Sequence, residues 1–273
     1  MQTKGKKTNK KVQLVYKPYK KGSAYNKGLL KRSLRVLAYF FLFLFLYFIL
    51  GTALQFDNQV LTMLANLLVV FTAGGLMFMD GARVGEGDVA FGETVLTREE
   101  KGRGLSKDDI ARCYHPMKAV VTAFLGVVPI LLLTIPFAVT SEKQAYILQG
   151  LPSWVSSFRE GYADMAAPLS YYPTSATLTA WDILRVIVRL LNLPFVSMVN
   201  GMEANALLWV DRLCPILVCL PAVGYPLGYL TGPRHRAMVH GNISRNQKRH
   251  EKMKRKAEKA RRNRNTQKTN QII

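Results

Sequence analysis

The chain has 273 residues, of which 49% are hydrophobic, and it carries a formal net charge of +21 at pH 7. The hydrophobic residues are concentrated in long runs, and the positive charge lies at the two ends of the chain. This distribution excludes an ordinary soluble domain and indicates a helical membrane protein. The three cysteines lie in different settings, so they predict neither a disulfide framework nor a metal site.

The first 35 residues contain twelve Lys and Arg residues and no acidic residue. They lack hydrophobic periodicity, so we expect 1–35 to be a flexible basic tail. An uncharged hydrophobic run of about 20 residues begins at Val36, and at ~1.5 Å of rise per residue it matches the ~30 Å hydrocarbon core of a bilayer. The run is too long for a signal peptide and no clear cleavage site follows, so it predicts an uncleaved anchor.

A second hydrophobic run follows after a short polar turn, so 36–79 is predicted to form a transmembrane hairpin. The next segment, 80–118, has balanced charge and a glycine-rich first half, which indicates a cytoplasmic loop. Within it, Ser106 and the carboxylate three residues later resemble a helix capping box. They predict a short helix over about 107–115, ended by Pro116.

Two further hydrophobic runs, 119–139 and 213–230, complete four predicted transmembrane helices. The first of them contains two prolines, which membrane helices tolerate. The region between the two runs, 140–212, is polar and aromatic. Trp and Tyr prefer the membrane–water boundary, so we expect this region to be extracytoplasmic or interfacial.

The segment 181–199 is hydrophobic and long enough to span, but Asp182, Arg185 and Arg189 lie on one face of its predicted helix. If it spanned, five crossings would place the two basic ends on opposite sides of the membrane, whereas basic flanks prefer the cytoplasm. We therefore favour an amphipathic or re-entrant helix on the outer face, broken at Pro194, with both guanidinium groups at the headgroup level. Five spans is the alternative.

The last segment, 231–273, contains fourteen Lys and Arg residues against two glutamates, and 245–264 has the composition of a helix that is polar all round. With four spans, both basic tails lie on the cytoplasmic side of the cell membrane. Such tails attract anionic lipid, RNA or ribosomes, or an acidic membrane-protein partner. The residues expected to make these contacts are Lys10, Lys11, Lys20, Lys21, Lys31, Arg32, Lys254, Arg255, Lys256, Arg261 and Arg262.

Charged residues in or beside apolar segments are the other candidate functional residues, because charges at membrane depth are costly. They are Asp182, Arg185, Arg189, Asp211 and Arg212. We add His115, which precedes Pro116 where the short helix is expected to meet the bilayer. Asp182 and Arg185 are also spaced to pair with each other along a helix.

Partial motifs do not predict catalysis. Asp80, Gly81, Ala82, Arg83 and Asp88 are only part of the aspartate-rich signature of phospholipid-synthesising phosphotransferases, whose further metal-binding aspartates are missing. The histidines show no ligand spacing, so no catalytic, cofactor or metal residue is assigned. The sequence favours a protein without enzymatic activity. It predicts an all-α, four-helix membrane protein acting as an accessory, assembly or scaffold component. The alternative is a transporter or channel component that uses 181–212.

Overall fold

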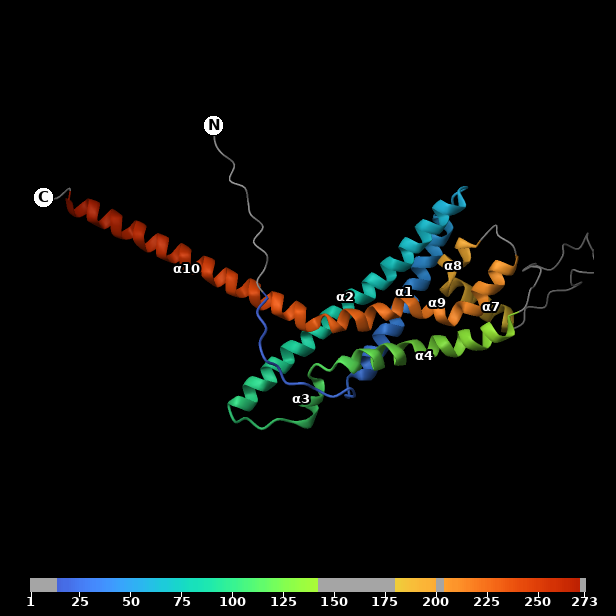
Figure 1. Ribbon diagram of the computed structural model, residues 1–273, viewed down its shortest axis with the longest axis horizontal. Coiled ribbons are helices and arrows are strands. Elements are labelled where there is room, and N and C mark those ends of the chain that lie inside the picture. Colours follow the sequence, from blue (N-terminus) through green and yellow to red (C-terminus); the bar gives the residue numbers. More distant parts are fainter. Residues whose placement is uncertain (1–13, 142–179, 200–203, 271–273) are drawn as a thin grey trace, which may run out of the picture. The chain divides into compact units, whose positions relative to one another are not determined.

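The computed structural model describes residues 14–141, 180–199 and 204–270, and within these ranges it contains helices and no strand (Figure 1). The helices are α1 (Leu29–Ala53), α2 (Gln59–Glu100), α3 (Lys107–Arg112), α4 (Pro116–Thr140), α7 (Ala180–Leu191), α8 (Leu193–Met198), α9 (Ala204–Leu230) and α10 (Gly232–Asn270). Most of the aromatic region predicted between the third and fourth spans, 142–179, lies outside the described residues.

Four of these helices, α1, α2, α4 and α9, are long and apolar enough to cross a membrane. For the described residues, the prediction of an all-helical fold with four apolar helices that could span a membrane is thereby confirmed. Large apolar side chains remain exposed along them, for example Phe41, Phe45 and Phe48 on α1. Because burial inside the protein does not account for these side chains, lipid is the environment that suits them.

Helix α1 begins at Leu29, so the predicted boundary of the basic tail at residue 35 is wrong. Leu29, Ser33, Val36 and Phe40 are buried at the spacing of one helical face, and the Ser33 hydroxyl donates to the Leu29 carbonyl at 3.1 Å. This buried face carries the helix into the basic segment, where Lys and Arg occupy the other positions.

The prediction of a loop over 80–118 is wrong for its first half, because 80–100 is the second half of helix α2. The helix has 42 residues, so at ~1.5 Å per residue it is about 63 Å long, roughly twice the hydrocarbon thickness. At two glycines of its polar second half, other backbone segments pack closely against the helix. A Cβ at Gly85 would collide with the Tyr229 carbonyl, and one at Gly92 would lie 2.8 Å from the Lys20 carbonyl oxygen.

The capping residue of α3 was predicted correctly, since the Ser106 side chain accepts a hydrogen bond from the Asp108 N–H at 3.3 Å. The helix ends at Arg112, three residues earlier than expected. Pro116 does not end it; instead, Pro116 is the first residue of α4. Proline suits this position because the first N–H of a helix has no partner within the helix.

Helix α9 begins at Ala204 and α10 runs from Gly232 to Asn270. The stretch 204–212, predicted as part of the interfacial region, is therefore helical. The C-terminal segment is one helix that includes the predicted 245–264.

The chain divides into two compact units. We call 1–28, 78–120 and 226–273 the terminal unit, because it carries both chain ends, and 29–77 with 121–225 the bundle unit.

In the bundle unit, the chain between α7 and α8 breaks at Asn192, and Pro194 lies in the first turn of α8, close to the predicted position. Helix α7 has 12 residues, about 18 Å, which is shorter than the hydrocarbon core. Both short helices contact α1. A Cβ at Gly51 of α1 would collide with the Leu193 side chain, so glycine permits this close packing.

Candidate functional site

In the terminal unit, α2 and the α9–α10 segment pack closely in the same direction. A Cβ at Gly228 would collide with the carbonyl of Phe78, and one at Gly232 would collide with the backbone of Gly85. Gly228 and Gly232 are four residues apart, the small-residue spacing that lets two helices approach at backbone distance. This packing brings polar side chains of α2, α4, α9 and α10 together.

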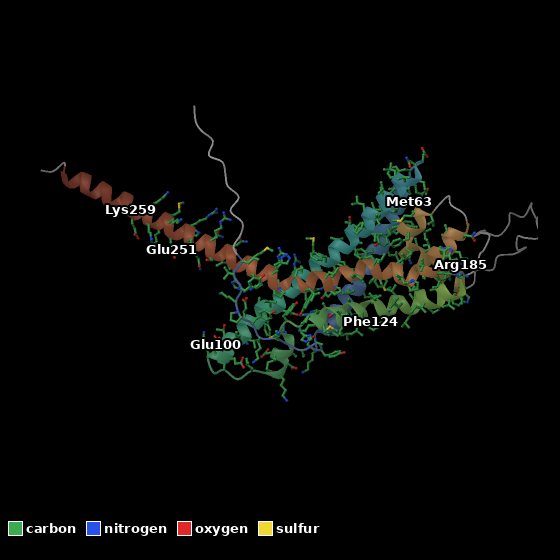
Figure 2. All side chains as sticks on the ribbon, viewed as in Figure 1. Met63, Glu100, Phe124, Arg185, Glu251 and Lys259 are labelled. Carbon is green, nitrogen blue, oxygen red and sulfur yellow. The ribbon has the colours of Figure 1, made fainter. Side chains whose placement is uncertain are left out.

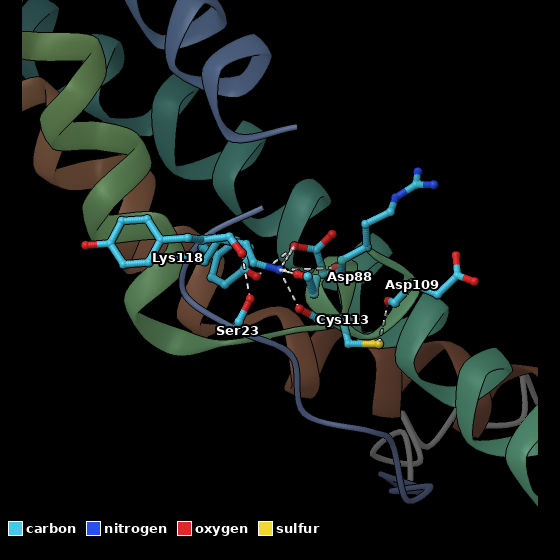
Figure 3. Close-up of polar contacts among 9 residues, drawn as sticks. Ser23, Asp88, Asp109, Cys113 and Lys118 are labelled. Carbon is cyan, nitrogen blue, oxygen red and sulfur yellow. Dashed lines mark hydrogen bonds and ion pairs between the residues drawn. The ribbon is translucent and has the colours of Figure 1, made fainter. Parts of the chain in front are cut away.

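The first polar group centres on Lys118, whose side chain is fully buried (Figure 3). Its Nζ donates to the carbonyl oxygens of Ala111, Arg112 and Cys113 at 3.0, 3.2 and 2.5 Å. Those carbonyls lie at the C-terminal end of α3, where the last helical carbonyls lack partners and the helix dipole favours a cation. Lys118 therefore holds α3 against the start of α4.

Asp88 of α2 supplies the negative charge for this group, 3.7 Å from the Lys118 Nζ. Its carboxylate also accepts a hydrogen bond from the Tyr229 hydroxyl at 2.8 Å. The Tyr229 ring is stacked on the ring of Tyr114, with centroids 5.0 Å apart. We call Asp88, Tyr114, Lys118 and Tyr229 the Lys118 cluster; it joins α2, α4, α9 and the chain between α3 and α4.

The Lys118 cluster has the chemistry of a structural site. An ammonium group has three N–H donors, and three carbonyl oxygens lie within hydrogen-bond distance of this one. Burial, together with a smaller contribution from Tyr19, raises the pKa of Tyr114. Burial likewise raises the pKa of Cys113, so its thiol stays protonated at neutral pH. Among the described residues, no group of three His, Cys, Asp or Glu side chains could hold a metal ion.

The N-terminal segment, which we define as 14–28, packs in the terminal unit rather than extending freely. Backbone N–H groups of Val15, Lys20 and Gly22 donate to the carbonyls of Ala237, Gly92 and Tyr114 at 3.2, 3.2 and 3.0 Å. Two of its lysines also form ion pairs, Lys20 with Glu99 at 2.7 Å and Lys27 with Asp108 at 2.8 Å. For these residues, the expectation of a flexible tail is wrong.

The second polar group joins the beginning of α10 to α2. The Arg236 guanidinium donates twice to one oxygen of Glu93, at 3.0 and 2.9 Å, and the His240 Nε2 lies 2.7 Å from the other oxygen. We call Glu93, Arg236 and His240 the α10 anchor. Beyond it, the side chains at 245–259, including those of Glu251 and Lys259, are all exposed (Figure 2).

In the bundle unit, the Arg189 guanidinium binds both carboxylate oxygens of Asp211 on α9, at 3.1 and 2.5 Å. The expectation that the Arg189 guanidinium reaches headgroups or water is therefore wrong, because it binds the buried carboxylate of Asp211 on α9 instead. Arg185 lies 3.5 Å from Asp182, the pair that the spacing predicts. Arg212 is exposed, and His115 is partly buried with an Nδ1 that has no hydrogen-bond partner within the described parts of the chain.

The other predicted tail residues are divided between different environments. Lys21, Lys31, Lys254, Arg255 and Lys256 are exposed, whereas Arg32 is partly buried on α1. Lys10 and Lys11 lie outside the described residues. Arg261 and Arg262 belong to α10, but their side chains are outside the described set.

Sequence reasoning missed the residues that make both polar groups. They are Asp88, Glu93, Tyr114, Lys118, Tyr229, Arg236 and His240. One available signal was the four-residue spacing of Gly228 and Gly232, together with Gly81 and Gly85, which is typical of closely packed helices. A second was the single lysine at the start of an otherwise apolar run.

No protein-family model matches this chain, and neither a curated protein nor a solved structure matches it.

Proposed function

We propose that this protein is a membrane-embedded scaffold that presents the basic part of α10 to an anionic partner. The observation that carries the proposal is the α10 anchor. Arg236 and His240 bind the same carboxylate of α2, so the first turns of α10 are fixed while the basic residues that follow are exposed. A fixed helix loses less conformational entropy on binding than a free tail does.

The state of the buried polar residues supports a scaffold over an enzyme. Lys118 caps α3, Asp88 binds Lys118 and Tyr229, and Glu93 binds α10. A catalytic nucleophile or base must be within reach of a substrate. The charged groups of Lys118, Asp88 and Glu93 instead form hydrogen bonds and ion pairs that join helices. On this proposal the α10 anchor holds α10 directly, and the Lys118 cluster stabilises the helices around it.

Co-purification from native membranes tests the proposal. The test variant replaces four exposed basic residues of α10: Lys252→Gln, Arg255→Gln, Lys256→Gln and Lys259→Gln. The control removes the same charge at exposed positions elsewhere: Lys17→Gln, Lys101→Gln, Arg103→Gln and Lys107→Gln. We expect the α10 variant, and not the control, to lose its bound protein, RNA or lipid. Identical co-purifying material from wild type and both variants would contradict the proposal.

We further propose that both basic ends lie on the cytoplasmic side of the cell membrane, since basic flanks prefer that side. A single cysteine at Thr266, in a chain whose native cysteines are replaced, should resist a membrane-impermeant thiol reagent in intact cells and react after lysis. Reaction in intact cells would place the C-terminal end outside the cell and contradict the proposal.

A transport role is the second candidate, and the ion pair between Arg189 and Asp211 is the observation that favours it. Charges inside a membrane bundle commonly mark a substrate or ion path. If the pair has this role, vesicles containing the protein should show proton or chloride flux that Asp211→Asn abolishes and that Arg212→Ala, at an exposed position, leaves unchanged. Flux equal to that of empty vesicles would remove this candidate for both ions.

A further inference from the structure

In the exposed part of α10, most basic residues lie on one side of the helix and the acidic residues lie outside that side. The segment is polar all round, as predicted, but its charges are not evenly distributed. Basic residues recur at intervals of three or four, which places them on one side of a helix. They are Arg245, Lys248, Arg249, Lys252, Arg255, Lys256 and Lys259, and we call them the basic stripe; Lys254, the other Lys or Arg of 245–259, lies on the opposite side of the helix. At about 100° per residue they fall within a sector roughly 120° wide.

Acidic residues are excluded from the basic stripe. Glu251 and Glu258 are the acidic residues of this part of α10, and each lies about 100° or more from the centre of the stripe. The stripe itself contains no apolar side chain. From Arg245 to Lys259 it is about 21 Å long, and all seven side chains are exposed. It is a continuous cationic surface on an ordered helix.

The position of the α10 anchor argues against a lipid surface as the partner. Glu93 lies fourteen residues beyond Met79, the end of the apolar part of α2, which is roughly 21 Å of helix. The headgroup layer accounts for only about 5–8 Å of this distance, and surface charge is screened within about 8 Å at physiological salt. Contacts from Gly232 to Gly85 and from Arg236 to Glu93 advance in the same sense along both helices. The stripe begins beyond them.

The composition of the stripe argues against a protein partner. Protein interfaces bind through central aromatic and aliphatic side chains with charges at the rim, and the stripe has no such centre. A nucleic acid, in contrast, carries phosphates at high density: double-stranded DNA has one per ~1.7 Å of its axis, or about twelve along ~21 Å, and duplex RNA likewise has one phosphate per nucleotide on each strand. Seven cations on one face complement that density of charge.

Resting on the proposed function, we propose that the basic stripe binds the sugar–phosphate backbone of RNA. Lys and Arg without Asn, Gln or aromatic neighbours on the same face provide phosphate contacts and little base recognition, so binding does not depend on sequence. RNA is assigned because the proposed topology places α10 on the cytoplasmic side of the membrane, the side on which membrane proteins are synthesised.

The test uses the full chain in nanodiscs of zwitterionic lipid and a 20-base-pair RNA of random sequence. With up to seven phosphate contacts, the slope of log affinity against log salt should reach about −6, a loss of about 10³-fold between 50 and 200 mM salt. The four-residue α10 variant described above should bind at least about tenfold more weakly with a slope near −3, and the control variant should match the wild type.

Three results would overturn the assignment. They are RNA affinity that is equal in the two variants, duplex DNA bound at least about tenfold more tightly than RNA, and binding only to vesicles that contain anionic lipid. If RNA binding fails while the α10 variant still loses a protein or lipid in native-membrane co-purification, the RNA assignment falls and the scaffold stands. If the variant matches the wild type in both experiments, both proposals fail.

Discussion

The two basic ends of this chain have similar compositions and different structures. The N-terminal segment is extended, and its backbone and lysines contact other parts of the terminal unit, as in the Lys20–Glu99 pair. The C-terminal end is a helix whose beginning contacts α2 through Gly232, Arg236 and His240 and whose side chains at 245–259 are exposed. Charge density alone therefore does not distinguish a segment that stabilises the fold from one that is available to a partner.

Backbone hydrogen bonding explains the difference. An extended segment has backbone N–H groups that must find acceptors elsewhere, and the carbonyls of Gly92, Tyr114 and Ala237 supply them. The backbone N–H and C=O groups of a helix bond to each other, so α10 needs no backbone hydrogen bonds from other segments. Its contacts with α2 serve to hold it in position. Experiments that release one end while leaving the other intact would sharpen this comparison.

The largest effect is expected from removing Lys118, because the end of α3 that it caps is where the N-terminal segment packs. Lys118→Ala leaves three carbonyls and Asp88 without their cation in a buried site, which costs about 3–5 kcal/mol. Lys101→Ala, at an exposed position, should stay within about 0.5 kcal/mol of wild type. Urea unfolding followed by amide exchange in α3 measures both. A loss below about 1 kcal/mol would show that Lys118 is not a structural cation.

A smaller loss is expected from filling the space at Gly22. A Cβ there would lie 2.8 Å from the Ile110 carbonyl oxygen and closer still to the Cys113 carbonyl, so Gly22→Ala must displace the segment, at about 1–3 kcal/mol. The matched control is Gly28→Ala, whose Cβ would meet only Asn26, at 3.6 Å. Limited trypsin digestion should cut near Lys20 in the first variant and spare the second. Equal digestion would place the segment outside the packed structure.

The C-terminal end is released by Glu93→Ala. This change leaves Arg236 and His240 partly buried without their carboxylate, so the first turns of α10 should lose about 1–3 kcal/mol of local stability. Glu100→Ala, exposed on the same helix, is the control. Amide exchange over 234–240 should rise in the first variant, with 14–28 much less affected. If amide exchange over 234–240 stayed the same, the close packing of Gly232 against Gly85 would be sufficient to hold α10.

The smallest effect is expected at the ion pair of Lys20 and Glu99. Both side chains are more than a third exposed, so the pair should contribute at most about 1 kcal/mol and weaken as salt rises. Lys20→Ala is compared with Lys21→Ala in 50 mM and 1 M salt. A difference that persists unchanged at high salt would mean that Lys20 acts through packing rather than charge.

The sequence predicts the features that depend on local chemistry. Uncharged runs of bilayer length identify the four apolar helices, and the Ser106 cap and the break before Pro194 follow from single residues. The glycines of 80–100 led to the wrong prediction of a loop, because glycine is common both in loops and where helices pack closely. The helix is explained by the backbone of Tyr229 and Lys20, which packs against Gly85 and Gly92 and is distant in sequence. The contact between Arg189 and Asp211 does not follow from the position of either residue in the sequence, since spacing within one helix gives no information about another helix.

Amide hydrogen exchange of the full chain in nanodiscs, with and without duplex RNA, tests most directly the claim that one basic end is packed and the other is available. We expect protected amides at Lys20 and Gly22 before RNA is added, and fast exchange at 245–259 that slows when RNA binds. The opposite pattern would contradict the account: 14–28 exchanging like an unfolded chain, or 245–259 already protected without a partner and unchanged by RNA.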